Sequence, residues 1–430
     1  MRNRPDARGR SRPLLLVAAL ALAAAGCAQF RLRPDLEEGR KAALYTGTIE
    51  RVESQGAPVL VVLYDPAASA PEPIAYDLVP GSGSYALVAL AGERRIFAFE
   101  DLDGDFRCDD GEPSGALAGS PVDARAHPGP GSEGRIRVAA GGPPPPFPLD
   151  LSQTGPGAPG SKQVRLGEVV TLDDPRFDPA RAGDGIWEPI SFLRTIGLRI
   201  DFLEPWDPAR RPVLLVHGMG GTPRDFRTMI ERLDRSKYQP WIYYYPTGLS
   251  LRFSAWGLDR LLRELEARLG LGRIDLIAHS MGGLVSRAAL DLRRESGDRA
   301  LVERFVTLST PWNGIAAARM SKLARTEAPS WRDMIPDSDF LRGLRAAPLD
   351  PAIEHTLLFG FRADKLSTDS NDGTVTLASE LPLEIQEGAR RIRGFDASHE
   401  SILTDAAVSA LLERILGAPA APPGSPPTPP

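Results

Sequence analysis

The spacing of hydrophobic residues along the chain changes near residue 164. Before this point, short apolar or alternating runs are separated by clusters of Gly, Pro and Ser, at residues 59–64, 84–90 and 95–100. Runs of this length between turn-forming residues are typical of β-strands. We therefore expect residues 45–140 to form a small antiparallel β-sandwich.

Between residues 164 and 416, buried apolar strands alternate with amphipathic helices. The expected strands lie at residues 198–204, 213–217, 241–246, 274–280, 304–310 and 355–361. The expected helices, in which apolar residues recur three and four positions apart, lie at residues 224–235, 254–269 and 282–296. This alternation predicts an α/β fold with a mostly parallel sheet covered by helices on both faces. Ligands of such sheets bind at the carboxyl ends of the strands.

Three segments lack these periodicities. Residues 141–163 and 417–430 are rich in Pro and Gly, which predicts a linker between two domains and a disordered tail. Residues 28–44 are charged and mixed in composition. We expect them to form a tether with about one helical turn.

The first 27 residues have the pattern of an export signal. Five arginines among the first 12 residues precede an apolar run over residues 14–25, which is too short to be a stable membrane-spanning helix. The sequence LALAAAGC resembles a bacterial lipoprotein signal, and this resemblance implies that Cys27 becomes the lipidated first residue. Ala28 after the cysteine then implies anchoring to the outer membrane. The alternatives are an ordinary secretory signal or a short anchor.

Charge and cysteine content exclude some functions. The chain has 51 Lys and Arg against 56 Asp and Glu, a net charge of -5, so no general positive field attracts it to nucleic acid. Cys27 and Cys108 are the only cysteines. A lipidated Cys27 therefore leaves Cys108 without a partner for an intramolecular disulfide.

An acidic stretch, DLDGDFRCDDGEP, interrupts the expected β-sandwich. Asp101, Asp103, Asp105 and Asp109 occupy alternating or neighbouring positions, with Glu112 after them. Carboxylate oxygens spaced in this way suit a calcium ion, although the spacing differs from that of an EF-hand loop. The alternative is an acidic turn at the edge of the sandwich.

A candidate nucleophile lies at the end of the expected strand 274–280. The strand runs into His-Ser-Met-Gly-Gly, in which Ser280 is the serine, and an expected helix follows. A sharp turn between strand and helix exposes such a serine, and it requires small residues two positions before and after. Ala278 and Gly282 meet this requirement, with Ala278 where Gly is more usual.

A serine hydroxyl needs a base, and the chain offers five histidines. His127 lies in the expected β-sandwich, His217 and His279 are at strand ends beside the turn, and His355 begins a buried strand. His399 follows the last strand. Enzymes with this strand, serine, helix arrangement have the chain order nucleophile, acid, base, so His399 is the predicted base.

The acid that orients the base should follow the strand at residues 355–361. Asp364, Asp369 and Asp372 are the candidates. We choose Asp372, because it lies beside Gly373 in a tight turn followed by a short extended run. Asp364 is the second choice and has the alternative role of capping the loop.

Donors for a developing oxyanion are expected in the loop after the strand at residues 213–217. This loop has the sequence His-Gly-Met-Gly-Gly, whose glycines allow the backbone N–H groups to turn toward the site. The predicted donors are the N–H groups of Met219 and of Met281, the residue after the serine. A plain glycine-rich turn is the alternative.

Five motifs, VLLVHGMGG, LIAHSMGGLVSRAAL, TLSTPWNG, NDGTV and ASHES, together resemble the secreted bacterial lipases and esterases of the α/β-hydrolase superfamily. The resemblance covers residues 205–416. It implies hydrolysis of an ester or lipid substrate through an acyl-enzyme, without a cofactor. Trp312 departs from the pattern, because the family often has histidine at this position.

Several alternatives remain open at this stage. The same three residues support thioesterase and acyltransferase chemistry, and a non-catalytic binding protein at the cell surface belongs to a different class. Residues 315–351 contain an amphipathic stretch, which predicts either a lid over an acyl pocket or an ordinary pair of crossover helices.

Overall fold

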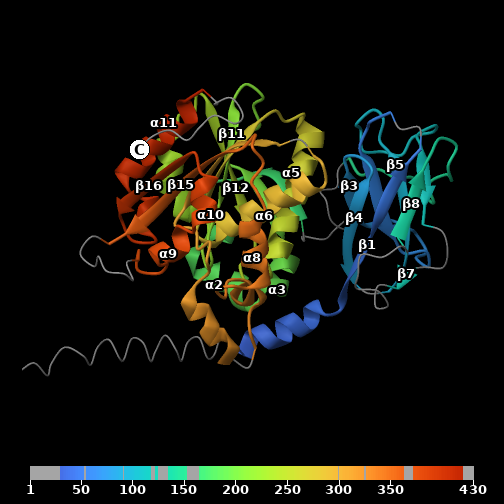
Figure 1. Cartoon of the computed structure of the whole chain (residues 1–430). Helices are drawn as coiled ribbons and strands as arrows, with labels where there is room; N and C mark the ends of the chain where they lie inside the picture. The colour runs from blue at the N-terminus through green and yellow to red at the C-terminus, as the bar shows by residue number, and fades with distance from the viewer. Residues whose placement is uncertain are drawn as a thin grey trace, which may run out of the picture.

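The computed structural model describes residues 30–52, 55–90, 92–117, 122–123, 134–152, 164–298, 300–323, 326–362 and 371–419. They form two parts that lie side by side, a β-domain near the N-terminus and a larger α/β part (Figure 1). No helix in these ranges has the length and the hydropathy needed to cross a bilayer. The signal-like residues 1–27, including Cys27, lie outside the described residues.

The β-domain is built from two sheets. One has the strand order β4-β1-β8, with β4 at Gly83–Leu90, β1 at Ala42–Arg51 and β8 at Arg135–Val138. The other has the order β3-β2-β5-β6, with β3 at Pro73–Val79, β2 at Val59–Tyr64, β5 at Glu93–Glu100 and β6 at Ser114–Ala116. A short strand, β7 at Val122–Asp123, pairs with β5. All the pairings are antiparallel except the one between β1 and β8.

Both faces of the second sheet of the β-domain are buried. Alternate residues of β2, such as Val61 and Leu63, pack against β1 and β4 of the first sheet. The intervening residues pack with Leu149 and Leu151, which are buried on the outer face. The N-terminal half of the expected linker, residues 141–163, therefore belongs to the β-domain, because its two leucines cover apolar surface. Residues 153–163 lie outside the described residues.

The expected tether is also largely structured. A helix covers residues 30–39, and β1 begins at Ala42. Leu32 and Asp35 of this helix are buried, and Asp35 accepts hydrogen bonds from the backbone of Ile190 and Ser191 in the α/β part. The composition concealed this helix, because few of its residues face the interior.

An eight-stranded sheet organises the α/β part. Its order is β16-β15-β14-β13-β11-β12-β10-β9, and all neighbours are parallel except β10 and β12. The strands are β9 (Val164–Val169), β10 (Leu198–Phe202), β11 (Arg211–Val216), β12 (Tyr238–Tyr244), β13 (Ile274–His279), β14 (Val302–Leu308), β15 (Glu354–Phe361) and β16 (Arg391–Asp396). The six expected strands and the mostly parallel sheet are present, with β9 and β16 added at the two edges.

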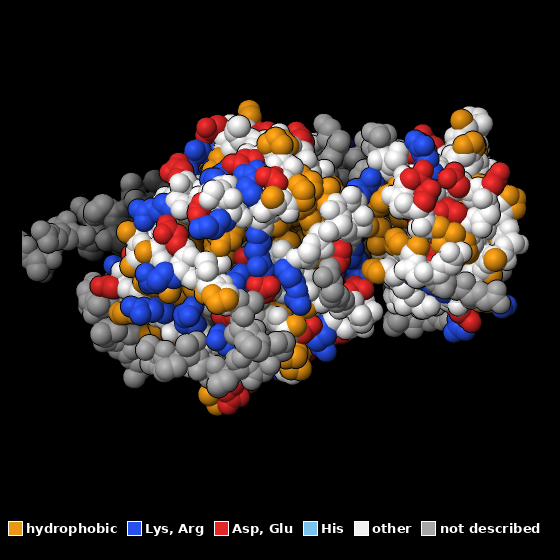
Figure 2. Space-filling view, turned by 90° about the horizontal axis from the view of Figure 1, so that it is seen from above, with side chains coloured by type: hydrophobic (Ala, Val, Ile, Leu, Met, Phe, Trp, Pro, Cys, Tyr) orange, Lys and Arg blue, Asp and Glu red, His pale blue; other side chains and the backbone are white. Residues whose placement is uncertain are grey.

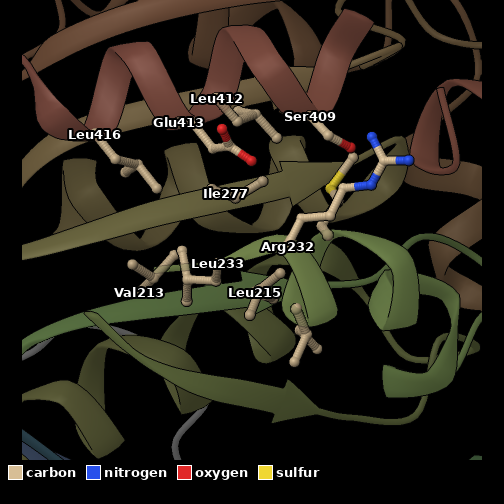
Figure 3. A pocket seen from close by; sticks show the side chains of 11 residues that line it. Val213, Leu215, Arg232, Leu233, Ile277, Ser409, Leu412, Glu413 and Leu416 are labelled. Atoms are coloured by element: carbon tan, nitrogen blue, oxygen red, sulfur yellow. The ribbon is translucent and has the colours of Figure 1, made fainter. Parts of the chain in front are cut away.

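Helices cover both faces of this sheet. On one face, α5 (Leu251–Leu269) and α6 (Met281–Glu295) pack against side chains such as Leu214 and Val216. On the other face, α4 (Arg227–Arg232) and α11 (Ala406–Gly417) pack against Val213 and Leu215. Figure 3 shows Leu412 and Leu416 of α11 above these strands, around a cavity of only about 20 Å³.

The remaining helices are short and lie in the connections. They are η2 (Pro175–Phe177), η3 (Pro179–Arg181), α2 (Ala182–Trp187), α3 (Pro189–Thr195), η4 (Pro223–Phe226), η5 (Ala316–Leu323), α7 (Pro329–Asp333), α8 (Asp339–Ala346), α9 (Leu377–Glu380), α10 (Leu383–Glu387) and η7 (Ser401–Leu403).

The two parts meet through buried polar contacts between β3 and α5. The hydroxyl of Tyr76 donates to Glu264 at 2.6 Å, and Arg268 donates to the same carboxylate oxygen at 2.6 Å. Arg260 pairs with Asp77 at 2.9 Å. Burial raises the pKa of both Glu264 and Tyr76. These contacts compensate for the cost of removing charged groups from water.

Candidate active site

Ser280 lies in a strained turn between β13 and α6. Its backbone has φ 53° and ψ −129°, and its N–H donates to the carbonyl of Leu308 at 2.8 Å. A residue other than glycine rarely has a positive φ. This backbone conformation costs about 1–3 kcal/mol and is kept only where the surrounding structure imposes it. The strand-to-helix turn expected from the sequence is therefore present.

Close backbone approach explains the glycines around Ser280. A Cβ atom on Gly282 would lie 2.4 Å from the carbonyl oxygen of Val216, and one on Gly218 would lie 2.8 Å from the Ser280 Cβ. Ala278, where Gly is more usual, is fully buried in β13.

His399 connects Ser280 to Asp372. Its Nε2 lies 2.8 Å from the Ser280 Oγ, and its Nδ1 lies 2.5 Å from the Asp372 Oδ2. The His399 backbone N–H also donates to the Asp372 carbonyl at 2.9 Å. Ser280 is 6% exposed to solvent, the His399 side chain 12% and Asp372 0%. Solvent therefore reaches the serine and the histidine but not the acid.

Asp372 is held as an ionised carboxylate. Its Oδ1 accepts hydrogen bonds from the N–H groups of Thr374 at 2.8 Å and Val375 at 2.7 Å. Burial raises the pKa of Asp372, but the hydrogen bond and charge of His399 together with these amides outweigh it, so the pKa lies below its ordinary value. The other two candidates, Asp364 and Asp369, lie outside the described residues.

His279 holds His399 in position, and this role of His279 was not predicted from the sequence. Its Nε2 donates to the His399 carbonyl at 2.8 Å, and the two rings lie 4.8 Å apart. Burial lowers the pKa of His279 to about 3, so its imidazole is neutral at neutral pH. The carbonyl acceptor fixes the proton on Nε2, and this hydrogen bond restrains the loop that carries His399.

The two predicted oxyanion donors adjoin the turn at Ser280: Met281 follows it in sequence, and Met219 follows Gly218, which packs against Ser280. Met281 is buried and is the first residue of α6, where backbone N–H groups have no partner within the helix. Met219 follows β11, and its Sδ accepts a hydrogen bond from the Trp331 indole at 3.1 Å. Gly220, next to it, has φ 64° and donates to Thr247 Oγ1 at 3.2 Å.

The described part of the segment over residues 315–351 contacts the loop after β11. Trp331 of α7 contacts Met219 and also Trp187 of α2, with ring centroids 5.6 Å apart. Asp333 accepts a hydrogen bond from the N–H of Leu251 at 2.7 Å, which ties α7 to the start of α5. Trp312 precedes this segment and is fully buried against His355, and its carbonyl accepts a hydrogen bond from Arg345 at 3.1 Å.

Glu380 is a second buried acid near Asp372 that the sequence did not indicate. It is 0% exposed. Burial, and next the charge of Asp372, raise its pKa to about 9. A neutral carboxyl is therefore expected at neutral pH, because two adjacent carboxylates resist ionising together.

The acidic loop of the β-domain gathers three carboxylates rather than four. Oxygens of Asp101, Asp103 and Asp105 lie within 4.8 Å of one another, and Asp109 does not belong to this group. The Asp109 N–H donates instead to Glu112, which shapes the end of the loop. Asp101 also accepts hydrogen bonds from the N–H groups of Gly104 and Phe106.

Comparison with known proteins agrees with this fold. Residues 211–342 match the family described as the alpha/beta hydrolase fold. With its sheet and its strand, serine, helix turn, this part of the chain has the α/β-hydrolase fold that its sequence motifs predicted. The comparison with curated proteins found no match.

Several solved structures are similar to part of the chain. Bacillus licheniformis lipase BlEst2 in mature form is 19% identical, with a TM-score of 0.41, over 50% of this chain and 97% of that one. Aspergillus fumigatus lipase B is 15% identical, with a TM-score of 0.39, over 52% and 57%. Phospholipase PlaB from Legionella pneumophila is 18% identical, with a TM-score of 0.33, over 40% and 45%.

Proposed function

We propose that this α/β hydrolase cleaves carboxylic esters through an acyl-enzyme formed on Ser280. The observation that carries the proposal is the hydrogen-bonded series Ser280, His399, Asp372, with distances of 2.8 and 2.5 Å. Nucleophile, base and orienting acid are the three groups that acyl transfer by a serine requires.

In the first half of the reaction, His399 Nε2 takes the proton of the Ser280 hydroxyl as its oxygen attacks the ester carbonyl. The oxyanion of the tetrahedral intermediate accepts hydrogen bonds from the N–H groups of Met219 and Met281. His399 then gives the proton to the alcohol that leaves. Asp372 stabilises the imidazolium and keeps the Nε2 directed toward the serine.

In the second half, water replaces the alcohol. His399 takes a proton from the water as it attacks the acyl carbon, and Ser280 leaves with that proton. Each step uses these side chains and water, so we expect turnover without a cofactor. Thioester hydrolysis and acyl transfer to a second alcohol use the same steps with another acceptor or leaving group.

Hydrolysis of two p-nitrophenyl esters tests the proposal. The native protein should cleave butyrate or palmitate, and Ser280→Ala should fall to near background. The ratio of the two rates distinguishes an esterase from a lipase. If the folded native protein is inert and a fluorophosphonate probe leaves Ser280 unlabelled, the chain is better explained as a binding protein of the cell surface.

We further propose that the protein is exported and anchored to the cell envelope by a lipid on Cys27. The support is the arginine-rich start, the apolar run over residues 14–25 and the small residues before the cysteine. Labelled palmitate should enter the native protein but not Cys27→Ala. Equal labelling of the two would contradict the proposal.

Calcium in the β-domain is a separate proposal. The three converging carboxylates of Asp101, Asp103 and Asp105 support it. Added Ca²⁺ should raise the Tm of the native protein more than equal Mg²⁺ does, and Asp103→Asn should abolish the difference. An unchanged Tm with millimolar Ca²⁺ would leave the loop as an acidic turn.

A further inference from the structure

The helix over residues 30–39 is fixed to the α/β part by its buried face. Asp35 accepts hydrogen bonds from the N–H groups of Ile190, at 2.7 Å, and Ser191, at 2.9 Å, and from the Ser191 hydroxyl at 2.6 Å. Its carboxylate thus caps the N-terminus of α3, where negative charge is favourable. Arg31 pairs with Asp184 and Glu188 at the ends of α2. These contacts hold the helix in one orientation.

This attachment lies at the edge of the sheet that carries the active site. β10 runs antiparallel to β12, with Arg199 opposite Tyr244, so the start of β10 meets the carboxyl end of β12. α2 and α3 lead directly into the start of β10 and therefore lie at the carboxyl edge. Ser280 lies at the same edge, after β13. In Figure 1, the helix over residues 30–39 lies beside α2 and α3 on this side of the molecule.

α2 connects the helix to the loop of the predicted oxyanion donors. The carbonyl of Gly185 accepts a hydrogen bond from Gly248 at 2.8 Å. A Cβ on Gly220, the residue after Met219, would lie 3.3 Å from the side chain of Ile186. The start of the helix over residues 30–39 therefore lies near the loop of Met219, which packs beside Ser280, and this side of the site is here called the entrance of the active site.

The start of this helix is also suited to a membrane surface. Phe30 is 76% exposed, and Arg33, whose side chain is 73% exposed beside Glu37, follows it one turn later. Aromatic and basic residues of this kind favour the interface of a bilayer. Cys27 precedes Arg31 by four residues, which span at most ~14 Å when extended. A lipid on Cys27 would bring this end of the helix to the membrane.

The opposite face of the molecule has a different character. Figure 2 views the face away from the helix over residues 30–39, and basic and acidic side chains are dispersed across it. Such a surface is suited to water.

We propose that the helix over residues 30–39 holds the entrance of the active site against the membrane that anchors the protein, so that the substrate is an ester lipid of that same membrane. The inference rests on the proposed ester hydrolysis and on the lipid at Cys27. The rigid attachment through Asp35 fixes the orientation of the entrance, and the short chain to Cys27 fixes its distance.

A flexible spacer after the lipidated cysteine releases the active site from the membrane surface and leaves the catalytic residues unchanged. We would insert roughly 20 Gly and Ser residues between Ala28 and Gln29, which adds a chain with an average span of ~25 Å. The same spacer after Pro430 is the matched control. Each lipoprotein is reconstituted into phosphatidylglycerol and phosphatidylethanolamine vesicles that carry a fluorogenic ester lipid. Hydrolysis of soluble p-nitrophenyl butyrate is measured in parallel.

The spacer at residue 28 should lower hydrolysis of the vesicle ester about fivefold or more, because the effective concentration of substrate at the entrance falls. Hydrolysis of the soluble ester should change less than about twofold, since the site itself is intact. The control spacer should change neither rate. A fluorescent fluorophosphonate on Ser280 should transfer energy to a lipid dye more efficiently in the native protein than in the spacer variant.

Equal vesicle rates and equal energy transfer in the native protein and the spacer variant would overturn the inference. So would a native protein that cleaves the soluble ester but not the vesicle ester. Failure of the proposed function has another signature: no protein cleaves the soluble ester, and Ser280 takes no probe. That result would remove the inference together with the function.

Discussion

At the scale of single residues, the site combines groups that the sequence indicates with groups that it does not. Ser280, His399 and Asp372 were predictable, because each lies at a characteristic place in chain order beside small turn-forming residues. His279 and Glu380 act through contacts between segments that are distant in the sequence. No local pattern distinguishes a histidine that holds another loop from one that only fills the core.

Removal of the His279 hydrogen bond should slow turnover without weakening substrate binding. In His279→Ala the His399 carbonyl loses its donor, so the loop of His399 loses a restraint, and we expect kcat to fall about 10- to 100-fold with KM little changed. His279→Gln, whose side-chain amide also donates, should recover part of the rate. The measurement is steady-state kinetics on p-nitrophenyl butyrate.

His355 provides the control for His279. It is also buried, but its Nε2 faces Thr307 Oγ1 at 3.0 Å and lies away from the triad. His355→Gln should therefore leave kcat within about twofold of native. Equal losses of kcat in the His279 and His355 variants would mean that His279 contributes through packing and not through its hydrogen bond to His399.

Glu380 should make stability depend on pH. Its folded pKa of about 9 lies above the ordinary value of 4.5. The folded state therefore holds a proton that the unfolded state loses, and the free energy of unfolding should decline as pH rises from 4.5 toward 9. Glu380→Gln removes this effect. Its Tm should exceed the native Tm by about 3 °C or more at pH 8 and match it near pH 4.5.

Thermal unfolding at both pH values measures this difference. Glu387→Gln is a suitable control, because Glu387 is an exposed acid at the end of α10 and the substitution is of the same kind. It should show no comparable change between the two pH values. An unaltered Tm of Glu380→Gln at pH 8 would mean that Glu380 is ionised in the folded protein.

At the scale of elements, periodicity predicted the interior of the α/β sheet but not its edges. The six expected strands are fully or largely apolar, whereas β16 has the sequence RIRGFD and only one buried residue. An edge strand is covered on fewer sides, so its composition carries a weaker signal. The same reason explains why β9 was not expected.

The helix α11 should be a large contributor to stability. Leu412 is buried between α11 and the strands β11 and β13, around the small cavity of Figure 3. Leu412→Ala enlarges that cavity and should lower the free energy of unfolding by about 2–4 kcal/mol. Glu413 is an exposed residue of the same helix, and Glu413→Ala should change the free energy of unfolding by less than about 0.5 kcal/mol.

Denaturant titration of both variants tests this packing. Equal, small effects of Leu412→Ala and Glu413→Ala would mean that α11 contributes little to the core. If the protein hydrolyses p-nitrophenyl butyrate as proposed, only the Leu412 variant should lose this activity at temperatures where the native protein is folded.

At the scale of the whole molecule, buried polar contacts join the β-domain to the α/β part, and no sequence pattern predicted them. Tyr76 and Glu264 are 188 residues apart and both buried, and Arg268 joins them. Arg268 pairs with Glu264 within α5, but the Tyr76 hydroxyl that completes this contact comes from the β-domain. The N-terminal helix was missed for the same reason, because its partners lie about 155 residues further along the chain.

Loss of the Arg268 charge should weaken the attachment of the β-domain. Arg268→Ala leaves the buried Glu264 without its cationic partner, and we expect a loss of about 3 kcal/mol in the free energy of unfolding. The double variant Arg268→Ala with Glu264→Gln removes the buried charge as well and should recover part of this loss. Denaturant titration gives both values, and the absence of any recovery would contradict the assigned pairing.

The distance in sequence between Asp35 and Ile190 also means that the helix over residues 30–39 is synthesised long before it can dock on α3. A chain that emerges from its N-terminus presents residues 28–39 long before α3 exists. During that interval the helix has no surface to dock on. Docking through Asp35 therefore comes late, after the whole β-domain has emerged, so the lipid proposed for Cys27 would be attached before the helix reaches its final position.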